Sequence, residues 1–234
     1  MNDERPRLPQ LTTPSDAVIT SVEWLFEPAW RGERLTVEVR EGEMHLFNEI
    51  GEPADEEFAE IAELLLDAID ADEAVLDGIW TSQPFLGEGS AARHLAEAIA
   101  EEGLTDELPD PLLAEKRRAF VALDLVELEG QPLHDIPYLE RRRLLTSVVV
   151  EGVQVRVSPA VRNPIHNWLS AWRANGFSHY VAKHVNSRYQ PGEMAEDWLE
   201  VSTGERRGPS AVGRLVGARP KKVARIHDER AEDG

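Results

Sequence analysis

The stretch LFEPAWRGERLTVEV, residues 25–39, guides the interpretation of the whole chain. An apolar run ends at Glu27, a turn follows around Gly32, and apolar residues then alternate with polar ones as far as Val39. Alternation of this kind predicts a β-strand, and a glycine between two such runs predicts a turn. Charged side chains therefore gather beside a turn between two strands, where binding residues are often found.

Patterns typical of strands and helices alternate along the rest of the chain. Strands are predicted over residues 17–30, 74–80, 119–130, 153–159 and 179–185, a hairpin over 34–50, and helices over 53–72, 91–103, 138–148 and 163–176. A glycine turn is predicted at 87–90 and a surface loop at 105–112. Because a hairpin is mixed with single helices, we expect an α+β fold with largely antiparallel sheets rather than a doubly wound parallel sheet.

The composition predicts a soluble protein with a hydrophobic core. Hydrophobic residues make up 41% of the 234 positions, and no apolar run reaches the roughly 20 residues that a membrane span requires. The N-terminus is too polar for a signal peptide, so we expect a cytoplasmic protein with no membrane contact. The absence of cysteine excludes disulfides, a thiolate nucleophile and a cysteine-bound zinc site.

The charge is large and unevenly distributed. The net charge of −19 argues against general nucleic-acid binding, which depends on Lys and Arg. Residues 1–203 hold 17 basic and 39 acidic side chains, and the remainder holds eight basic ones. We therefore predict a polar extension over residues 1–16, one domain over 17–203 and a basic, flexible tail over 204–234, with any DNA contact weak and confined to the tail. The acidity is equally consistent with adaptation to a salty cytoplasm.

General catalytic and metal-binding motifs are missing from the sequence. It contains no P-loop, no H-E-x-x-H and no G-x-S-x-G pattern. His166, His179 and His184 are not spaced to share a helix face, so we expect no metal site. Asp77 and Asp124, like Glu27, lie at or near predicted strand ends, where a carboxylate either binds a ligand or caps a turn.

Several short segments, in order, resemble the motifs of one family. They are EPAWRGER (27–34), NEIG (48–51), LDGI (76–79), FVALDLV (120–126), ERRRLL (140–145), GFSHYVAK (176–183), SRYQPG (187–192) and WLEVS (198–202). In this order and spacing they resemble the adenylation (nucleotidyltransferase) domain of ATP-dependent DNA ligases. The resemblance implies an ATP-grasp-like nucleotidyltransferase fold, with two antiparallel-rich sheets, flanking helices and an ATP pocket between the sheets.

The same comparison shows replacements at positions that carry the family's chemistry. The first motif of the family is E-x-K-x-D-G-x-R, whose lysine attacks the α-phosphate of ATP to form lysyl-AMP. Ala29 stands in place of that lysine, and Arg31 replaces the acid two residues later. Other replacements are Ile79 and Ser178 for carboxylates, His179 for a glycine, and Glu200 and Ser202 for two lysines. Without the nucleophile, self-adenylation is predicted to be absent.

A partial nucleotide-binding set remains. By resemblance it consists of Glu27, Arg34, Asp77, Phe120 and Lys183. Phe120 is included as a substitute for the aromatic that stacks on adenine, because a leucine directly precedes Asp124. The ligand that this set implies is ATP or AMP with Mg.

The leading hypothesis is a non-catalytic, ligase-like binding or regulatory module of DNA repair, with DNA-repair or ligase proteins as partners. The 32 residues after Ser202 are too few for the oligonucleotide-binding barrel (OB fold) of active ligases, so no such domain is expected. One alternative is an active ATP-dependent DNA ligase or nucleotidyltransferase with an unrecognised nucleophile. Another is an acidic partner protein unrelated to nucleotides.

Overall fold

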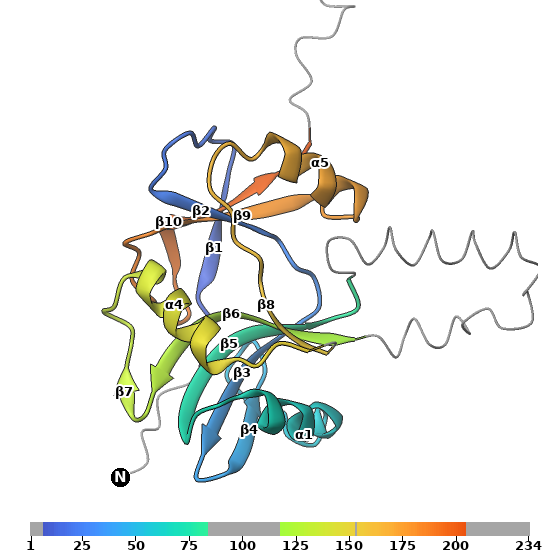
Figure 1. The fold of residues 1–234 in the computed structure, drawn as a ribbon, viewed down its shortest axis with the longest axis vertical. Coiled ribbons are helices and arrows are strands. Elements are labelled where there is room, and N and C mark those ends of the chain that lie inside the picture. Colours follow the sequence, from blue (N-terminus) through green and yellow to red (C-terminus); the bar gives the residue numbers. More distant parts are fainter. Residues whose placement is uncertain (1–6, 84–117, 153, 205–234) are drawn as a thin grey trace, which may run out of the picture. The chain divides into compact units, whose positions relative to one another are not determined.

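The computed structural model describes residues 7–83, 118–152 and 154–204, which form two β-sheets with flanking helices (Figure 1). One sheet has the order β1 (Leu11–Ser15), β10 (Met194–Ser202), β9 (His179–His184) and β2 (Trp24–Pro28). The other has the order β4 (Glu43–Phe47), β3 (Glu33–Arg40), β5 (Glu73–Thr81), β6 (Ala119–Leu128) and β7 (Gln131–Pro132), and β8 (Val155–Val157) pairs with β6. We call them the β9 sheet and the β5 sheet.

Most neighbouring strands in both sheets are antiparallel. The exceptions among the described strands are β1 with β10 and β6 with β8, which are parallel. The strand β2 leads through residues 29–32 directly into β3, so the stretch 25–39 connects the two sheets. The expected α+β fold with two antiparallel-rich sheets is confirmed.

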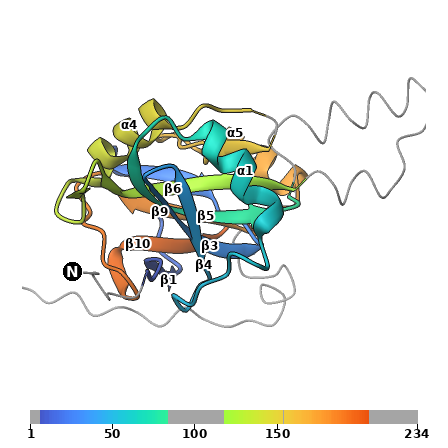
Figure 2. The same ribbon diagram turned by 90° about the horizontal axis from the view of Figure 1, so that it is seen from below.

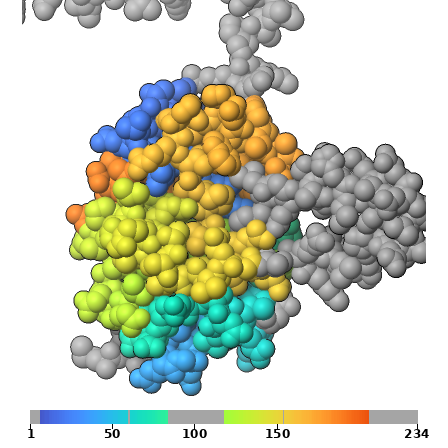
Figure 3. All heavy atoms as spheres, viewed as in Figure 1, coloured from blue at the N-terminus to red at the C-terminus, as the bar shows by residue number. Residues whose placement is uncertain are grey.

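Three helices lie along one side of the strands (Figure 2). They are α1 (Ala59–Ala68), α4 (Tyr138–Val148) and α5 (His166–Ala174). The segments that follow α1 and α4 are joined by two backbone hydrogen bonds, from Asp70 N–H to the Val148 carbonyl and from Val150 N–H to the Ala68 carbonyl. Figure 3 shows the resulting neighbourhood, with α1 in teal below the yellow end of α4.

The hydrophobic interior consists of one cluster that belongs to the β5 sheet and others that join the two sheets. One cluster joins α1 and α4 to the β5 sheet through residues such as Ile61, Leu145 and Leu76. A second cluster joins Trp172 of α5 to the β9 sheet, and it reaches β6 of the other sheet at Leu123. Packing of this kind fixes the separation of the sheets, and with it the space between β2, β6 and β9.

The N-terminal region differs from the prediction. Residues 11–15, placed in a polar extension by the sequence, form β1 and pair with β10. Their side chains are mostly exposed or half-buried, so apolar periodicity could not reveal the strand; backbone pairing and the bond from Gln10 N–H to the Tyr189 hydroxyl hold it. The strand predicted from residue 17 begins only at Trp24, because the amide of Asn163 binds the carbonyls of Ile19 and Ser21 in a loop.

Other predictions shift or fall outside the described residues. The helix expected from residue 53 begins at Ala59, after a turn in which Phe58 N–H donates to the Ala54 carbonyl. The glycine turn at 87–90, the helix at 91–103, the loop at 105–112 and the tail beyond Gly204 all lie outside the described residues.

Candidate functional site

A small cavity lies between the two sheets, beside the turn after β2. Its volume is about 110 Å³, whereas sites for drug-sized ligands usually span roughly 300–1,000 Å³. The lining residues are Thr12, Glu27, Pro28, Ala29, Trp30, Arg31, Arg34, Leu123, His179, Val181, Lys183, Trp198 and Glu200. The structure therefore brings Ala29 and three of the sequence-predicted site residues, Glu27, Arg34 and Lys183, to one place.

Glu27 and Lys183 form a buried ion pair in this cavity. The Lys183 Nζ lies 3.2 Å from the Glu27 Oε1, and the two side chains are 3% and 1% exposed. Nζ also donates to the Leu123 carbonyl at 3.0 Å. It lies 4.2 Å from the ring centre of Trp198 and 4.8 Å from that of Tyr138. The ammonium is thus held by a carboxylate, a carbonyl and two aromatic faces, all favourable to a cation.

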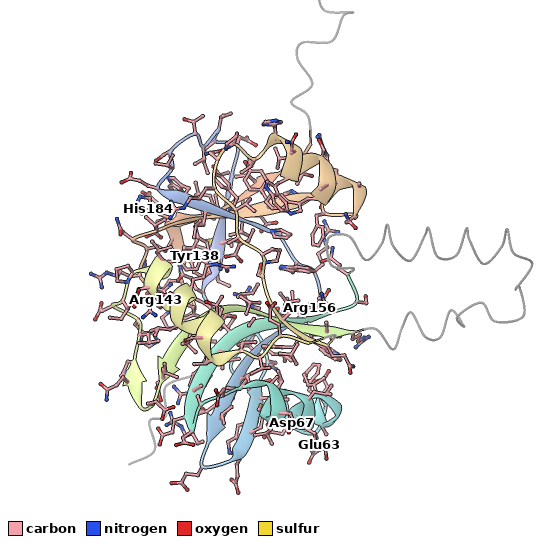
Figure 4. All side chains as sticks on the ribbon, viewed as in Figure 1. Glu63, Asp67, Tyr138, Arg143, Arg156 and His184 are labelled. Atoms are coloured by element: carbon pink, nitrogen blue, oxygen red, sulfur yellow. The ribbon has the colours of Figure 1, made fainter. Side chains whose placement is uncertain are left out.

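Tyr138 and Arg142 complete the surroundings of Glu27. The Tyr138 hydroxyl, at the start of α4 (Figure 4), donates to Glu27 Oε1, and Arg142 Nη1 lies 3.7 Å from the same oxygen. Burial alone would raise the pKa of Glu27, but Lys183, Arg142 and Tyr138 together outweigh it and lower the pKa. For Lys183 burial dominates and lowers the pKa, against the opposing effect of Glu27.

Arg34 is bound by Asp77 in a two-point ion pair. Its Nε and Nη2 lie 2.5 and 2.6 Å from the two Asp77 carboxylate oxygens. Asp77 is fully buried and also accepts from the Tyr189 hydroxyl at 2.9 Å. Burial would lower the pKa of Arg34, but Asp77 reverses this and the pKa is raised. Asp77 therefore serves as a counter-ion behind Arg34 and does not itself line the cavity.

The sequence analysis did not assign a role to Arg141, which forms the third buried pair. Its Nε and Nη2 donate to Asp124 at 2.9 and 2.7 Å, and both side chains are fully buried. Nη1 donates to the carbonyls of Ile136 and Ser187. Asp124 lies opposite Asp77 in the β5–β6 pairing. Arg141 lies three residues after Tyr138 on the inner face of α4. This helical spacing is the sequence signal that could have indicated a buried role for Arg141.

Phe120 does not reach the cavity, and its predicted role in adenine stacking needs correction. Side chains alternate along β6, so Phe120 and Ala122 face the cluster under α1 while Val121 and Leu123 face the cavity side. Phe120 packs instead on Gly78, where an added Cβ would lie 2.1 Å from the ring. Leu123 takes the cavity position, and it offers no aromatic face for a base.

The residues that depart from the family motifs contact one another at the rim. Arg31 Nη2 donates to Ser178 Oγ at 2.6 Å, and Ser178 Oγ lies 3.0 Å from His179 Nδ1. Thr12 donates to Glu200 Oε2 at 3.0 Å. Ile79 is buried in the apolar cluster beside Trp30 and leaves no carboxylate there.

The described residues include neither a cluster suited to a metal ion nor a helix suited to a membrane. Within the described ranges, no group of three or more His, Asp or Glu side chains could hold a metal ion. The helices of the same ranges include none long and apolar enough to cross a membrane.

Comparison with known proteins places this geometry in a family. The ATP dependent DNA ligase domain family matches residues 6–201, a range that includes every strand described above except the last residue of β10. The chain belongs to this family. Ala29, predicted from the motif resemblance to stand at the lysine position of the first motif, lines the cavity between the sheets.

The relatives in this family are distant and longer. The multifunctional non-homologous end joining protein LigD of Mycobacterium bovis is 26% identical over 184 residues, which cover 79% of this chain and 22% of that protein. A DNA ligase of Methanothrix thermoacetophila is 25% identical over 197 residues, which cover 78% and 32%. The chain thus spans less than a third of the length of these relatives.

Solved structures show the same fold. The ligase domain of Mycobacterium tuberculosis LigD matches with a TM-score of 0.61 at 24% identity, covering 83% of this chain and 59% of that one. A mycobacterial DNA ligase D complexed with ATP and MES matches with a TM-score of 0.60.

Proposed function

We propose that this chain is a non-catalytic member of the ligase family, a binding or regulatory module of DNA repair that does not transfer AMP. One observation carries the proposal. The cavity wall has Ala29 at the nucleophile position, and the lysine that does line the cavity, Lys183, is buried against Glu27. Adenylation requires an amine that can reach the α-phosphorus while pyrophosphate leaves, and Lys183 Nζ is instead engaged by the Glu27 carboxylate and the Leu123 carbonyl.

The residues around the cavity support the same conclusion. ATP with Mg is the ligand that the family implies, but the residues present do not fit it. The cavity of about 110 Å³ is small for an adenosine, and Leu123 replaces the aromatic that would stack on it. Ile79 and Ser178 supply no carboxylate for a metal, and Glu200 presents a negative charge where a lysine would hold phosphate.

The DNA-repair context rests on the relatives, whose names include DNA ligase and non-homologous end joining DNA repair proteins. We infer partners among DNA-repair or ligase proteins rather than duplex DNA, because residues 1–203 hold 39 acidic and only 17 basic side chains and repel phosphates. Any contact with DNA is assigned to the basic residues after 203.

A label-transfer experiment tests the proposal. The protein is incubated with α-³²P-labelled ATP and Mg²⁺, denatured, and examined for label on the chain, with a family member that has the first-motif lysine as positive control. We expect no label on this protein. A labelled band that is lost in Lys183→Ala would show an active enzyme with an atypical nucleophile and would overturn the proposal.

A further inference from the structure

We propose that the rim of this cavity binds a small phosphate oxyanion, such as inorganic phosphate or pyrophosphate, directly and without a divalent metal. The inference deepens the proposed function and rests on it, since a nucleotide-transferring site would hold its phosphates through a metal. The rim consists of Arg31, Ser178 and His179, three residues that replace an acid, a carboxylate and a glycine of the family motifs. These replacements change the local charge from negative to positive.

Arg31 is fixed in place but keeps free donors. Its backbone N–H donates to Gln83 Oε1, its carbonyl accepts from Thr81 Oγ1 at 2.5 Å, and its Nη2 donates to Ser178 Oγ at 2.6 Å. Its Nε and Nη1 have no hydrogen-bond partner among the described residues, and the side chain is exposed at the cavity. Nη2 uses one of its two N–H groups on Ser178, so its other N–H and the neighbouring nitrogen on that side present the two-donor geometry that phosphate oxygens match.

The hydroxyl of Ser178 is placed to donate to His179 when the histidine carries its proton on Nε2. Because Arg31 donates to Ser178 Oγ, the single hydroxyl proton of Ser178 is free to donate to His179 Nδ1 across 3.0 Å. A neutral His179 then carries its proton on Nε2, which becomes a donor. The His179 backbone is also fixed, since its carbonyl accepts from Ala29 N–H at 3.1 Å. The rim thus offers donors from two side chains that line the same cavity.

The other charges of the cavity are largely balanced. Glu27 is paired with Lys183, and Arg34 with Asp77. The remaining carboxylate is Glu200, which accepts only from Thr12 among the described residues and opposes an anion. The affinity for an anion therefore depends on Arg31, which attracts it, and on Glu200, which repels it. A phosphate group requires less space than an adenosine, in keeping with a cavity of about 110 Å³.

Calorimetric titration in EDTA tests the proposal, with phosphate, pyrophosphate, AMP and adenosine as probes. We expect phosphate and pyrophosphate to bind, AMP to bind through its phosphate, and adenosine not to bind. Arg31→Ala should weaken pyrophosphate about tenfold or more, since it removes a charged hydrogen-bond donor. Glu200→Gln should strengthen it severalfold. Arg143→Ala, on the exposed side of α4 (Figure 4), is the matched control and should change nothing.

Three results would overturn the inference. They are no binding of phosphate or pyrophosphate in EDTA, equal affinity in Arg31→Ala, and binding of adenosine, which would indicate a nucleotide pocket. Arg31 is exposed, so its replacement should leave the fold intact, and the circular dichroism spectrum of the variant should match that of the wild type. If the protein binds neither phosphate nor pyrophosphate and is not labelled by ATP, this inference alone is rejected. If ATP labels the chain, the proposed function is rejected.

Discussion

Glu27 and Lys183 show how a single buried charge depends on its partner. Removing one member of such a pair leaves the other uncompensated, which typically costs about 3–5 kcal/mol. We predict that Glu27→Gln lowers the free energy of unfolding by about this amount. The double variant Glu27→Gln/Lys183→Met should recover much of the loss. Urea denaturation of the wild type, Glu27→Gln, Lys183→Met and the double variant measures the coupling energy between the two side chains.

The effect of Glu27→Gln should also depend on pH. The pKa of Glu27 is lowered in the folded protein, so its carboxylate contributes stability that is complete above the unfolded pKa of about 4.3. That contribution is lost as the pH falls through the lower, folded pKa, where protonated Glu27 resembles glutamine. The difference between wild type and variant should therefore shrink below about pH 4. The exposed pair Glu140–Arg143 is the control, and Glu140→Gln should leave the denaturation midpoint unchanged. A constant difference down to pH 2 would contradict this account.

At the scale of the elements, the packing of β5 against β6 depends on Gly78. A Cβ at Gly78 would lie 2.1 Å from the Phe120 ring, which is buried between the β5 sheet and α1. The ring must move to admit a methyl group, and overpacking of this kind costs about 1–3 kcal/mol. We predict a clear fall in melting temperature for Gly78→Ala.

Gly152 provides the matched control for this substitution. No atom lies within 4 Å of a Cβ built on Gly152, and its φ is not in the left-handed region. Gly152→Ala should therefore leave the melting temperature nearly unchanged or raise it slightly, since alanine restricts the unfolded chain. Equal effects of the two substitutions would show that Phe120 does not confine Gly78.

For the whole molecule, charge separates the folded unit from the C-terminal residues. The described strands end at Ser202, and eight basic residues lie after 203. We predict that the full chain binds duplex DNA weakly and only at low salt, since few cations are available to displace counterions. A chain that ends at Gly204 should lose this binding.

The truncated chain also tests the boundary of the folded unit. Its melting temperature should match that of the full chain, because the strands and helices described here end at Ser202. Fluorescence anisotropy with a labelled duplex at several salt concentrations measures binding. DNA affinity that is retained without residues 205–234 would assign the contact to the acidic body and contradict the prediction.

The sequence predicted those site residues that belong to short motifs, and it missed those whose positions depend on contacts between distant parts of the chain. Glu27, Arg34 and Lys183 were found because short motifs name them. Phe120 was misassigned because side chains alternate along β6, so that a residue three positions before Leu123 faces the opposite side of the sheet. Helical spacing could place Arg141 on the inner face of α4, but a local rule could not identify its partner Asp124, which lies 17 positions away. Nor could it find β1, whose pairing is made by backbone atoms.

The sequence by itself determined the family, the α+β class and the acidic charge, and it predicted that Ala29 replaces a lysine, because these follow from residue identity and order. Only the tertiary structure decided what the remaining polar residues do. It pairs Lys183 with Glu27 and Arg34 with Asp77, turns Phe120 away from the cavity, and brings Arg31 to Ser178 and His179. The physical reason is that electrostatic and hydrogen-bonding interactions depend on distances of a few ångströms between residues far apart in the chain.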